Sequence, residues 1–261
     1  MLLDGTVWLL TENDGAIRVV TLPEKNYTTK PEIYSTKSGL FPADHFYQVY
    51  QDRAGNNWLL TDNGLGMIRP GERQPVNYFV ETQGKQDGMN QAFYAVRECE
   101  DDICFTSDRG RIWCYQKKSG EFRLHELPTK ARITSIHAVG NDNTVVTTDS
   151  DGFFLSNLKT NKHIHYSPVT CKELSDQPIL SAYVDRTSEV WFEQEEPGVV
   201  VHFNPATGVV KREQMRVEYS NADRSRPAFH IHEDIHGHVW VHPYGGGFSY
   251  FDRERNCLVP F

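Results

Sequence analysis

The sequence predicts an all-β protein, a β-propeller of four-stranded antiparallel blades, and three observations lead to this fold class. The chain repeats itself with a period of about 45 residues. Apolar side chains alternate with period two, as in Val7 and Leu9 against Trp8 and Leu10, and helical spacing is nowhere sustained. A four-stranded unit of this length cannot bury both of its faces alone, so the units must stack around a common axis.

The first half of each repeat is a strand, an Asp-x-x-Gly turn and a second strand that carries a Trp. The two clearest copies are Asp52-Arg-Ala-Gly-Asn-Asn-Trp58 and Asp234-Ile-His-Gly-His-Val-Trp240. We expect both Asp carboxylates to accept backbone N–H groups of their own turns, and Gly55 and Gly237 to allow the backbone geometry there. The repeated Trp is expected to pack between blades.

The second half of each repeat is a Gly-led strand and a hairpin with Gly or Asn at its turn, for example Gly120, Gly208 and Asn256. These residue types tolerate the positive φ that a tight hairpin requires. The repeat therefore predicts four short strands per unit. Residues 1–261 form a single propeller domain or a propeller fragment, with units at 1–38, 39–85, 86–127, 128–172, 173–221 and 222–261.

The first unit begins in its turn, at Asp4 and Gly5, without the inner strand that precedes the turn in the other five units. An unpaired sheet edge invites pairing with another chain. We therefore expect this strand to be supplied upstream in a longer protein, with a seven-bladed ring or a double propeller as the complete arrangement.

Composition excludes several function classes. The chain has 261 residues and a net charge of −8, so a nucleic-acid-binding surface is not expected. No apolar window approaches the roughly 18 to 20 residues that a membrane helix needs. Five scattered cysteines without a CxxC pair indicate neither a zinc site nor a dense disulfide framework, and at most one or two bridges.

The segment Ser38–Leu65 resembles the two-component regulator propeller repeat, in which Gly-Leu, a strand, Asp-x-x-Gly-x-hydrophobic-Trp, a Thr and a second Gly-Leu follow one another. Elsewhere the pattern weakens, because Cys104 and Val146 replace the Trp and Ser188 and Asn143 stand at glycine positions. The resemblance implies the periplasmic sensor half of a membrane-bound hybrid two-component system of Bacteroides type. Such propellers sense glycan fragments and pass the signal to downstream domains of the same polypeptide.

Ligands of propellers usually sit at the face formed by the loops that lead into each inner strand and the loops between the second and third strands. Aromatic rings and bidentate polar groups bind sugars, and Arg additionally suits acidic sugars. The ligand-binding candidates on this face are His45, Arg109, Arg224, Arg226 and Tyr244.

Five of the eleven histidines fall between residues 230 and 242. Period two places His230 and His232 on one face of a strand and His238 and His242 on one face of the next, so a metal-binding pair or a pH-responsive patch is possible. No carboxylate or Cys completes a recognisable ligand set, so we assign neither a metal nor a cofactor.

The sequence thus favours a non-catalytic sensor propeller that binds an oligosaccharide or another small ligand. The main alternative is a propeller enzyme that resembles the streptogramin-lyase and lactonase group, with a metal and a catalytic His in the histidine cluster. A third possibility is a propeller whose loops contact protein, for instance a second copy in a homodimer.

Overall fold

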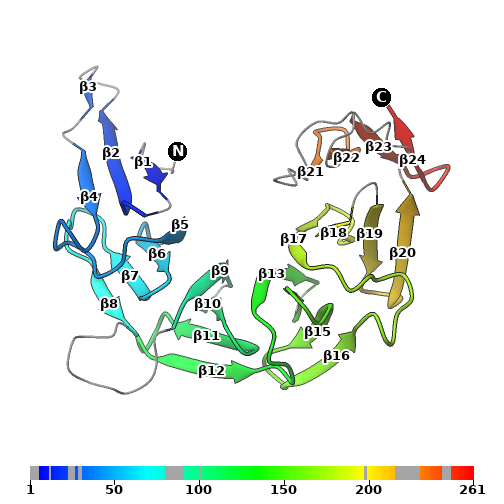
Figure 1. Cartoon of the computed structure of the whole chain (residues 1–261), viewed down its shortest axis with the longest axis horizontal. Coiled ribbons are helices and arrows are strands. Elements are labelled where there is room, and N and C mark those ends of the chain that lie inside the picture. The colour runs from blue at the N-terminus through cyan, green and yellow to red at the C-terminus, as the bar shows by residue number, and fades with distance from the viewer. Residues whose placement is uncertain are drawn as a thin grey trace. The chain divides into compact units, whose positions relative to one another are not determined.

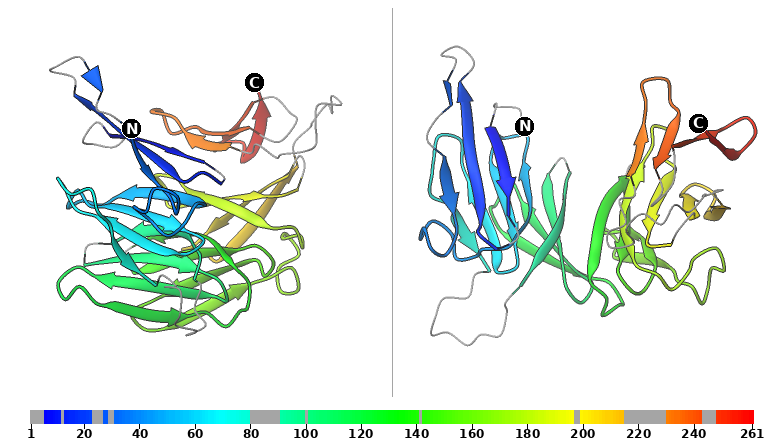
Figure 2. Two further views of the ribbon diagram at one scale, coloured as in Figure 1. Left: turned by 60° about the vertical axis from the view of Figure 1, so that its left-hand side comes forward. Right: turned by 45° about the horizontal axis from the view of Figure 1, so that its top comes forward.

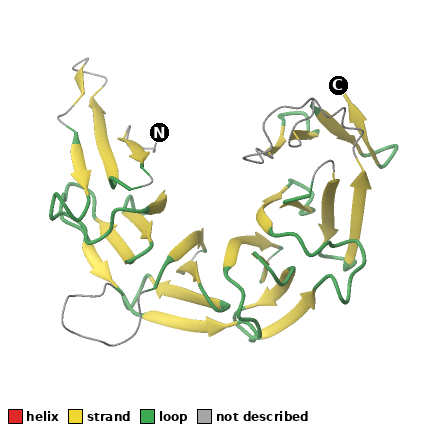
Figure 3. Cartoon of the chain, in the orientation of Figure 1, coloured by secondary structure: helices red, strands yellow, loops and turns green. Residues whose placement is uncertain are grey.

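A computed structural model describes residues 6–11, 13–22, 27–28, 31–79, 91–99, 101–140, 142–196, 199–214, 230–242 and 248–261. These residues form six four-stranded antiparallel sheets (Figure 1). Strands and loops make up the whole of the described chain, as Figure 3 shows. Within those ranges no helix is long and apolar enough to cross a membrane. The predicted all-β class and the four-stranded blades are therefore confirmed.

The chain divides into two compact units, residues 1–124 and 125–261, and each contains the greater part of three sheets. Figure 2 gives two further views of the sheets. In unit 1, blade 1 consists of β1 (Thr6–Leu10), β2 (Ala16–Leu22), β3 (Tyr27–Thr28) and β4 (Glu32–Tyr34), and blade 2 consists of β5 (Phe46–Gln51), β6 (Asn57–Thr61), β7 (Gly64–Ile68) and β8 (Val76–Tyr78). Blade 3 consists of β9 (Phe93–Glu98), β10 (Asp102–Ser107), β11 (Arg111–Gln116) and β12 (Phe122–Glu126). The last two residues of β12 belong to unit 2.

In unit 2, blade 4 consists of β13 (Ile133–Val139), β14 (Asn143–Thr148), β15 (Phe153–Asn157) and β16 (Lys162–Tyr166). Blade 5 consists of β17 (Ile179–Val184), β18 (Val190–Gln194), β19 (Val199–Asn204) and β20 (Val209–Gln214). Blade 6 consists of β21 (His230–Glu233), β22 (Val239–His242), β23 (Ser249–Asp252) and β24 (Cys257–Pro260). Blades 2 to 6 are simple meanders in which each strand pairs with the next.

Blade 1 differs from the other blades in its strand pairing. Its first described strand, β1, carries Trp8 and corresponds to the second strand of the other blades, while β4 and the short β3 both pair with β2. No described strand pairs with the other edge of β1, and Leu9 is 54% exposed. The corresponding Leu59 of blade 2 is completely buried.

The repeated Asp and Trp form one hydrogen-bonded motif in three blades. The Nε1 atoms of Trp58, Trp191 and Trp240 donate to the carboxylates of the residues six positions earlier, Asp52, Asp185 and Asp234, at 2.9, 2.8 and 2.9 Å. The same carboxylates accept two backbone N–H groups each from their own turns. The expected role of Asp52 and Asp234 in their turns is confirmed.

The turn residues take the backbone conformations that the sequence predicts. Gly55 and Gly237 have φ values of 84° and 90°, and Ser188, which stands at the glycine position of blade 5, has a φ of 67°. In the connections between third and fourth strands of blades 2 to 6, the residues with positive φ are Gly71, Gly120, Asn161, Gly208 and Asn256.

The Trp residues pack between neighbouring blades, as predicted. Trp58 is completely buried and contacts Phe105 and Tyr115 of blade 3, with ring centroids 4.9 and 5.1 Å away. In unit 2, Trp191 is also buried and meets Phe251 of blade 6 at 4.9 Å. Each unit therefore has apolar cores of its own between its sheets.

Blade 3 replaces the Trp motif with a disulfide. Cys104 occupies the Trp position and lies directly opposite Cys114 on the neighbouring strand, with Cα atoms 4.0 Å apart and a bond between the two sulfurs. Both residues are buried. The other three cysteines, Cys99, Cys171 and Cys257, are free. One bridge agrees with the small number that the scattered cysteines allow.

Candidate functional site

The first strands of blades 2 to 5 each carry a bulge at the same position. The register with the second strand skips Tyr47 in β5, Tyr94 in β9, Thr134 in β13 and Leu180 in β17. In every case this is the second residue of the strand. A bulged residue is left out of the ladder and its side chain is re-aimed, and for this reason bulges are frequent beside functional sites.

In blades 3 and 4, hydroxyl groups of the second strand form hydrogen bonds at the bulge. In blade 3, the amide of Ala95 donates to Oγ1 of Thr106 at 3.1 Å. In blade 4, Oγ1 of Thr147 lies 2.7 Å from Oγ1 of Thr134 and 2.6 Å from Oγ of Ser135. In these two blades, side chains of the second strand thus provide hydrogen bonds at the position where the ladder is interrupted.

In unit 1, the bulged residues join a row of aromatic rings. The His45 and Tyr47 ring centroids are 4.5 Å apart, and those of Tyr47 and Tyr94 are 4.8 Å apart with an interplanar angle of 57°. The row crosses from blade 2 to blade 3, and Tyr47 is 38% exposed. We call His45, Tyr47 and Tyr94 the aromatic row.

A carboxylate closes one end of the aromatic row. The Tyr94 hydroxyl lies 3.1 Å from both carboxylate oxygens of Asp108, which stands in the loop between β10 and β11. The next two residues, Arg109 and Gly110, have φ values of 59° and 68°, as a two-residue hairpin turn requires. At the other end, the carbonyl of His45 accepts the amide of Asp62 at 3.3 Å.

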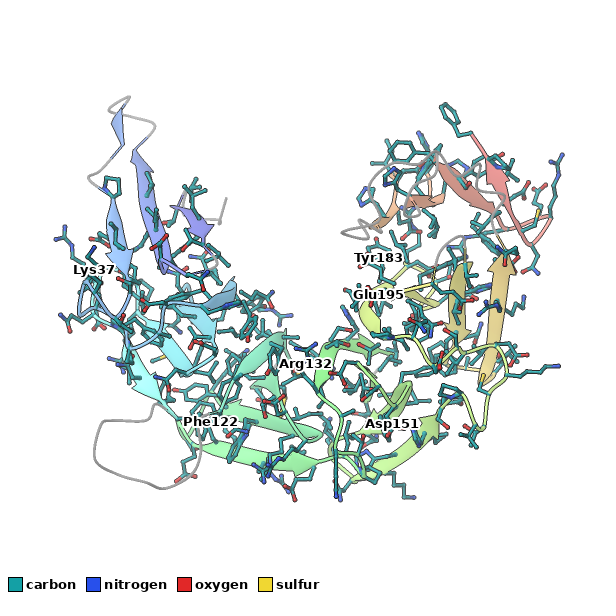
Figure 4. All side chains as sticks on the ribbon, in the orientation of Figure 1. Lys37, Phe122, Arg132, Asp151, Tyr183 and Glu195 are labelled. Atoms are coloured by element: carbon teal, nitrogen blue, oxygen red, sulfur yellow. A yellow bond between two sulfur atoms is a disulfide. The ribbon has the colours of Figure 1, made fainter. Side chains whose placement is uncertain are left out.

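Unit 2 has the same bulges with different chemistry. The Thr134 hydroxyl donates to the carbonyl of Ile179 at 2.6 Å, and the bulged Leu180 is 40% exposed. Arg132, labelled in Figure 4, forms an ion pair with Asp149 at 3.4 Å. Neither bulged residue in unit 2, Thr134 or Leu180, carries an aromatic ring. Among the described residues, aromatic rings at bulged positions are therefore found in unit 1.

The structure describes two of the five predicted ligand-binding residues, His45 and Arg109. His45 is part of the aromatic row, and Arg109 follows the Asp108 that holds Tyr94. Arg224, Arg226 and Tyr244 lie outside the described residues. Sequence reasoning missed Tyr47 and Tyr94 because strand alternation does not reveal a bulge. The available signal was the Phe-Tyr pair that begins both β5 and β9.

The histidine candidates are spread over both ends of blade 6. His238 is at the turn end of β22, where its Nδ1 lies 3.0 Å from the Asp234 carboxylate, whereas His242 ends that strand and stacks near Phe248 at 4.7 Å. Four residues of strand separate their Cα atoms by about 13 Å. His242 is paired in register with His230, and His232 with Trp240.

No group of three His, Cys, Asp or Glu side chains in the described ranges could hold a metal ion. His238 is instead part of the Asp234 turn, whose hydrogen bonds from Trp240 and from the amide and side chain of His238 keep the pKa of that carboxyl below its usual value. In the described part of the histidine cluster, His238 is thus hydrogen-bonded to Asp234 and His242 packs against Phe248.

No family model matches the chain, and no curated protein matches it. Many solved structures have the same fold. Virginiamycin B lyase from Staphylococcus aureus is similar over 100% of this chain and 82% of its own length, with a TM-score of 0.70 and 16% identity.

The chain is also similar to extracellular domains of hybrid two-component systems of B. thetaiotaomicron. The BT4673 domain matches 100% of this chain with a TM-score of 0.60 and 15% identity, and the BT3049 domain matches 84% with a TM-score of 0.62 and 18% identity. This chain spans 40% and 30% of their lengths. The sheets and these similarities together define the chain as a β-propeller.

Proposed function

We propose that this propeller is a non-catalytic, extracytoplasmic ligand-binding part of a two-component regulator, and that it binds a carbohydrate on the aromatic row. The observation that carries the proposal is the row itself, in which two bulges bring Tyr47 and Tyr94 together with His45. Sugar rings bind to aromatic faces and to a few well-placed polar groups, and Asp108 supplies such a group.

Two further observations support the setting. The Cys104–Cys114 disulfide suits an oxidising compartment such as the periplasm. The likeness to extracellular domains of hybrid two-component systems gives a precedent for this fold in the extracellular part of such a regulator. Binding would favour one of two arrangements of the regulator, and downstream domains of the same polypeptide, in a homodimer, would report the change.

Isothermal titration of the purified chain against a panel of glycan oligosaccharides tests the proposal. Tyr47→Ala and Tyr94→Ala should each weaken the binding at least about tenfold, since loss of an aromatic contact costs on the order of 1.5 kcal/mol. Leu180→Ala is the matched control, because it truncates an exposed bulged residue at the same position in unit 2. Failure of a folded sample to bind any glycan in the panel would overturn the proposal.

The enzyme alternative has a separate test. A propeller lyase would retain a stoichiometric metal after purification and would lose activity on His230→Ala or His242→Ala substitution. Metal content together with cleavage of a cyclic depsipeptide or lactone by the wild-type chain would contradict the non-catalytic role.

A further inference from the structure

One carboxylate contacts the aromatic row, and two further aspartates lie next to the row in the chain or contact it through their backbone. Asp108 contacts Tyr94 directly, and Asp62 donates its amide to the carbonyl of His45. The residue before His45 is Asp44, whose carboxylate accepts the amide of Thr36 at 2.8 Å and also the hydroxyl of that residue. Asp108 is thus the carboxylate that contacts the row, whereas Asp62 reaches His45 through its backbone and the Asp44 carboxylate is bound to Thr36.

Arg109 is the cation nearest in sequence to these groups, but the described residues show no cation–π contact between it and the row. Its backbone forms the turn with Gly110, and its side chain is exposed. The Asp108 carboxylate is thus held by its two contacts with the Tyr94 hydroxyl, whereas the Arg109 side chain is positioned only by the turn that its backbone forms.

We propose that the aromatic row selects neutral oligosaccharides of at least two sugar rings and discriminates against uronic and sulfated ones. This inference rests on the proposed function and adds the chemical class of the ligand. A carboxylate accepts hydrogen bonds from sugar hydroxyls, and a charged acceptor makes them stronger than neutral pairs. Asp108, held at Tyr94, is the acceptor for a ring stacked on that side chain.

Ligand length follows from the geometry of the row. Adjacent ring centroids are 4.5 and 4.8 Å apart, so three rings in succession extend beyond the face of a single sugar. Because the planes of Tyr47 and Tyr94 are inclined at 57°, the flat face of one sugar can stack on only one of these rings, and a second sugar is needed to contact the other. Affinity should therefore rise from one sugar to two and level off once the row is covered.

Charge selection follows from electrostatics. A ligand carboxylate or sulfate about 4 Å from Asp108 is repelled by roughly 1 kcal/mol in a watery environment, or about fivefold in affinity. Because salt screens exposed charges, this difference should become smaller as ionic strength rises. An Arg-based site for acidic sugars would show the opposite order of affinities and would also lose affinity in salt.

The experiment titrates the wild-type chain with neutral gluco-, xylo- and manno-oligosaccharides and with oligogalacturonides and heparin fragments of equal length, at two ionic strengths. Neutral chains of two or more sugars should bind at least about fivefold more tightly than acidic chains. Asp108→Asn keeps a hydrogen-bond acceptor for Tyr94 and should reduce this preference. Asp101→Asn, an equal charge change in the turn at the opposite end of β10, should leave the preference unchanged.

The possible failures are distinct from one another. Acidic chains that bind as tightly as neutral ones, or an unchanged preference in Asp108→Asn, would overturn the selectivity while leaving carbohydrate binding intact. Equal affinity for monosaccharides and longer chains would overturn the predicted length. Absence of binding by every glycan, with a folded sample by circular dichroism, would overturn the proposed function as well.

Discussion

At the residue scale, the carboxylate of Asp185 does more than form a turn. Asp185 accepts hydrogen bonds from two turn amides, from Trp191 and from Arg253 of blade 6, whose Nη2 lies 2.8 Å away. Its side chain is completely buried. The same carboxylate therefore shapes the turn of blade 5, orients the Trp between the sheets and binds the next blade.

Asp185→Asn should destabilise the chain at pH 7 by about 3 kcal/mol, because it leaves the guanidinium of Arg253 without its shortest ion-pair contact. Asp234→Asn is the matched control, since the Asp234 carboxylate holds its own turn and Trp240 in the same way, with the His238 ring in place of an arginine as its further side-chain partner. Urea unfolding followed by tryptophan fluorescence measures both. Equal losses in the two variants would contradict a special contribution from Arg253.

The effect of Asp185→Asn should also depend on pH. Burial opposes ionisation of Asp185, but hydrogen bonds from Arg253, Thr187 and Trp191 outweigh it and hold its pKa below the usual value. A carboxyl with a lowered folded-state pKa stabilises the fold above about pH 4, and this contribution disappears as the pH falls through the folded pKa. The difference between wild type and Asp185→Asn should shrink on acidification, which unfolding at pH 7, 4 and 3 would measure.

At the element scale, blade 3 shows how one pair of positions can hold a sheet in different ways. The pair is Trp58 and Met67 in blade 2, Trp191 and His202 in blade 5, and Cys104 and Cys114 in blade 3. His202 stacks on Trp191 at 4.5 Å. Blade 3 has no Asp–Trp hydrogen bond, and a covalent link joins its two central strands instead.

Replacing Cys104 and Cys114 together by Ala should lower the free energy of unfolding by about 2–4 kcal/mol, because the bridge restricts the unfolded chain. The short loop that it closes places the expected loss toward the lower end of this range. Dithiothreitol should destabilise the wild-type chain and leave the double variant unaffected. Cys257→Ser serves as the control because Cys257 is free. Insensitivity of wild-type stability to reduction would show that the bridge contributes little.

The repeat pattern predicts strands and turns better than it predicts irregularities in how the strands pair. Four strands per unit and the positive φ at Asn161 and Asn256 follow from local chemistry, because turn residues act within a few positions of the chain. The bulges at Tyr47 and Tyr94 depend on how two strands slide against each other, which alternation leaves open. For the same reason the pairing of Cys104 with Cys114 could not be chosen among five cysteines.

At the scale of the whole molecule, stability should reside in two units. The apolar clusters of unit 1 form around Phe46 and Trp58, and those of unit 2 form around Phe192 and Trp191. Both the disulfide and the aromatic row belong to unit 1. A change at the disulfide or at the aromatic row should therefore alter the stability of the first three blades more than that of the last three.

Amide hydrogen exchange with and without reduction tests this division. Reduction of Cys104–Cys114 should accelerate exchange in the strands of blades 2 and 3, where the buried cores share residues with β10, and should leave β14, β15, β18 and β19 protected. Local exchange follows the free energy of opening each cooperative unit, so a bridge within one unit stabilises that unit alone. Equal acceleration in both halves would instead mean that residues 1–124 and 125–261 open as one cooperative unit.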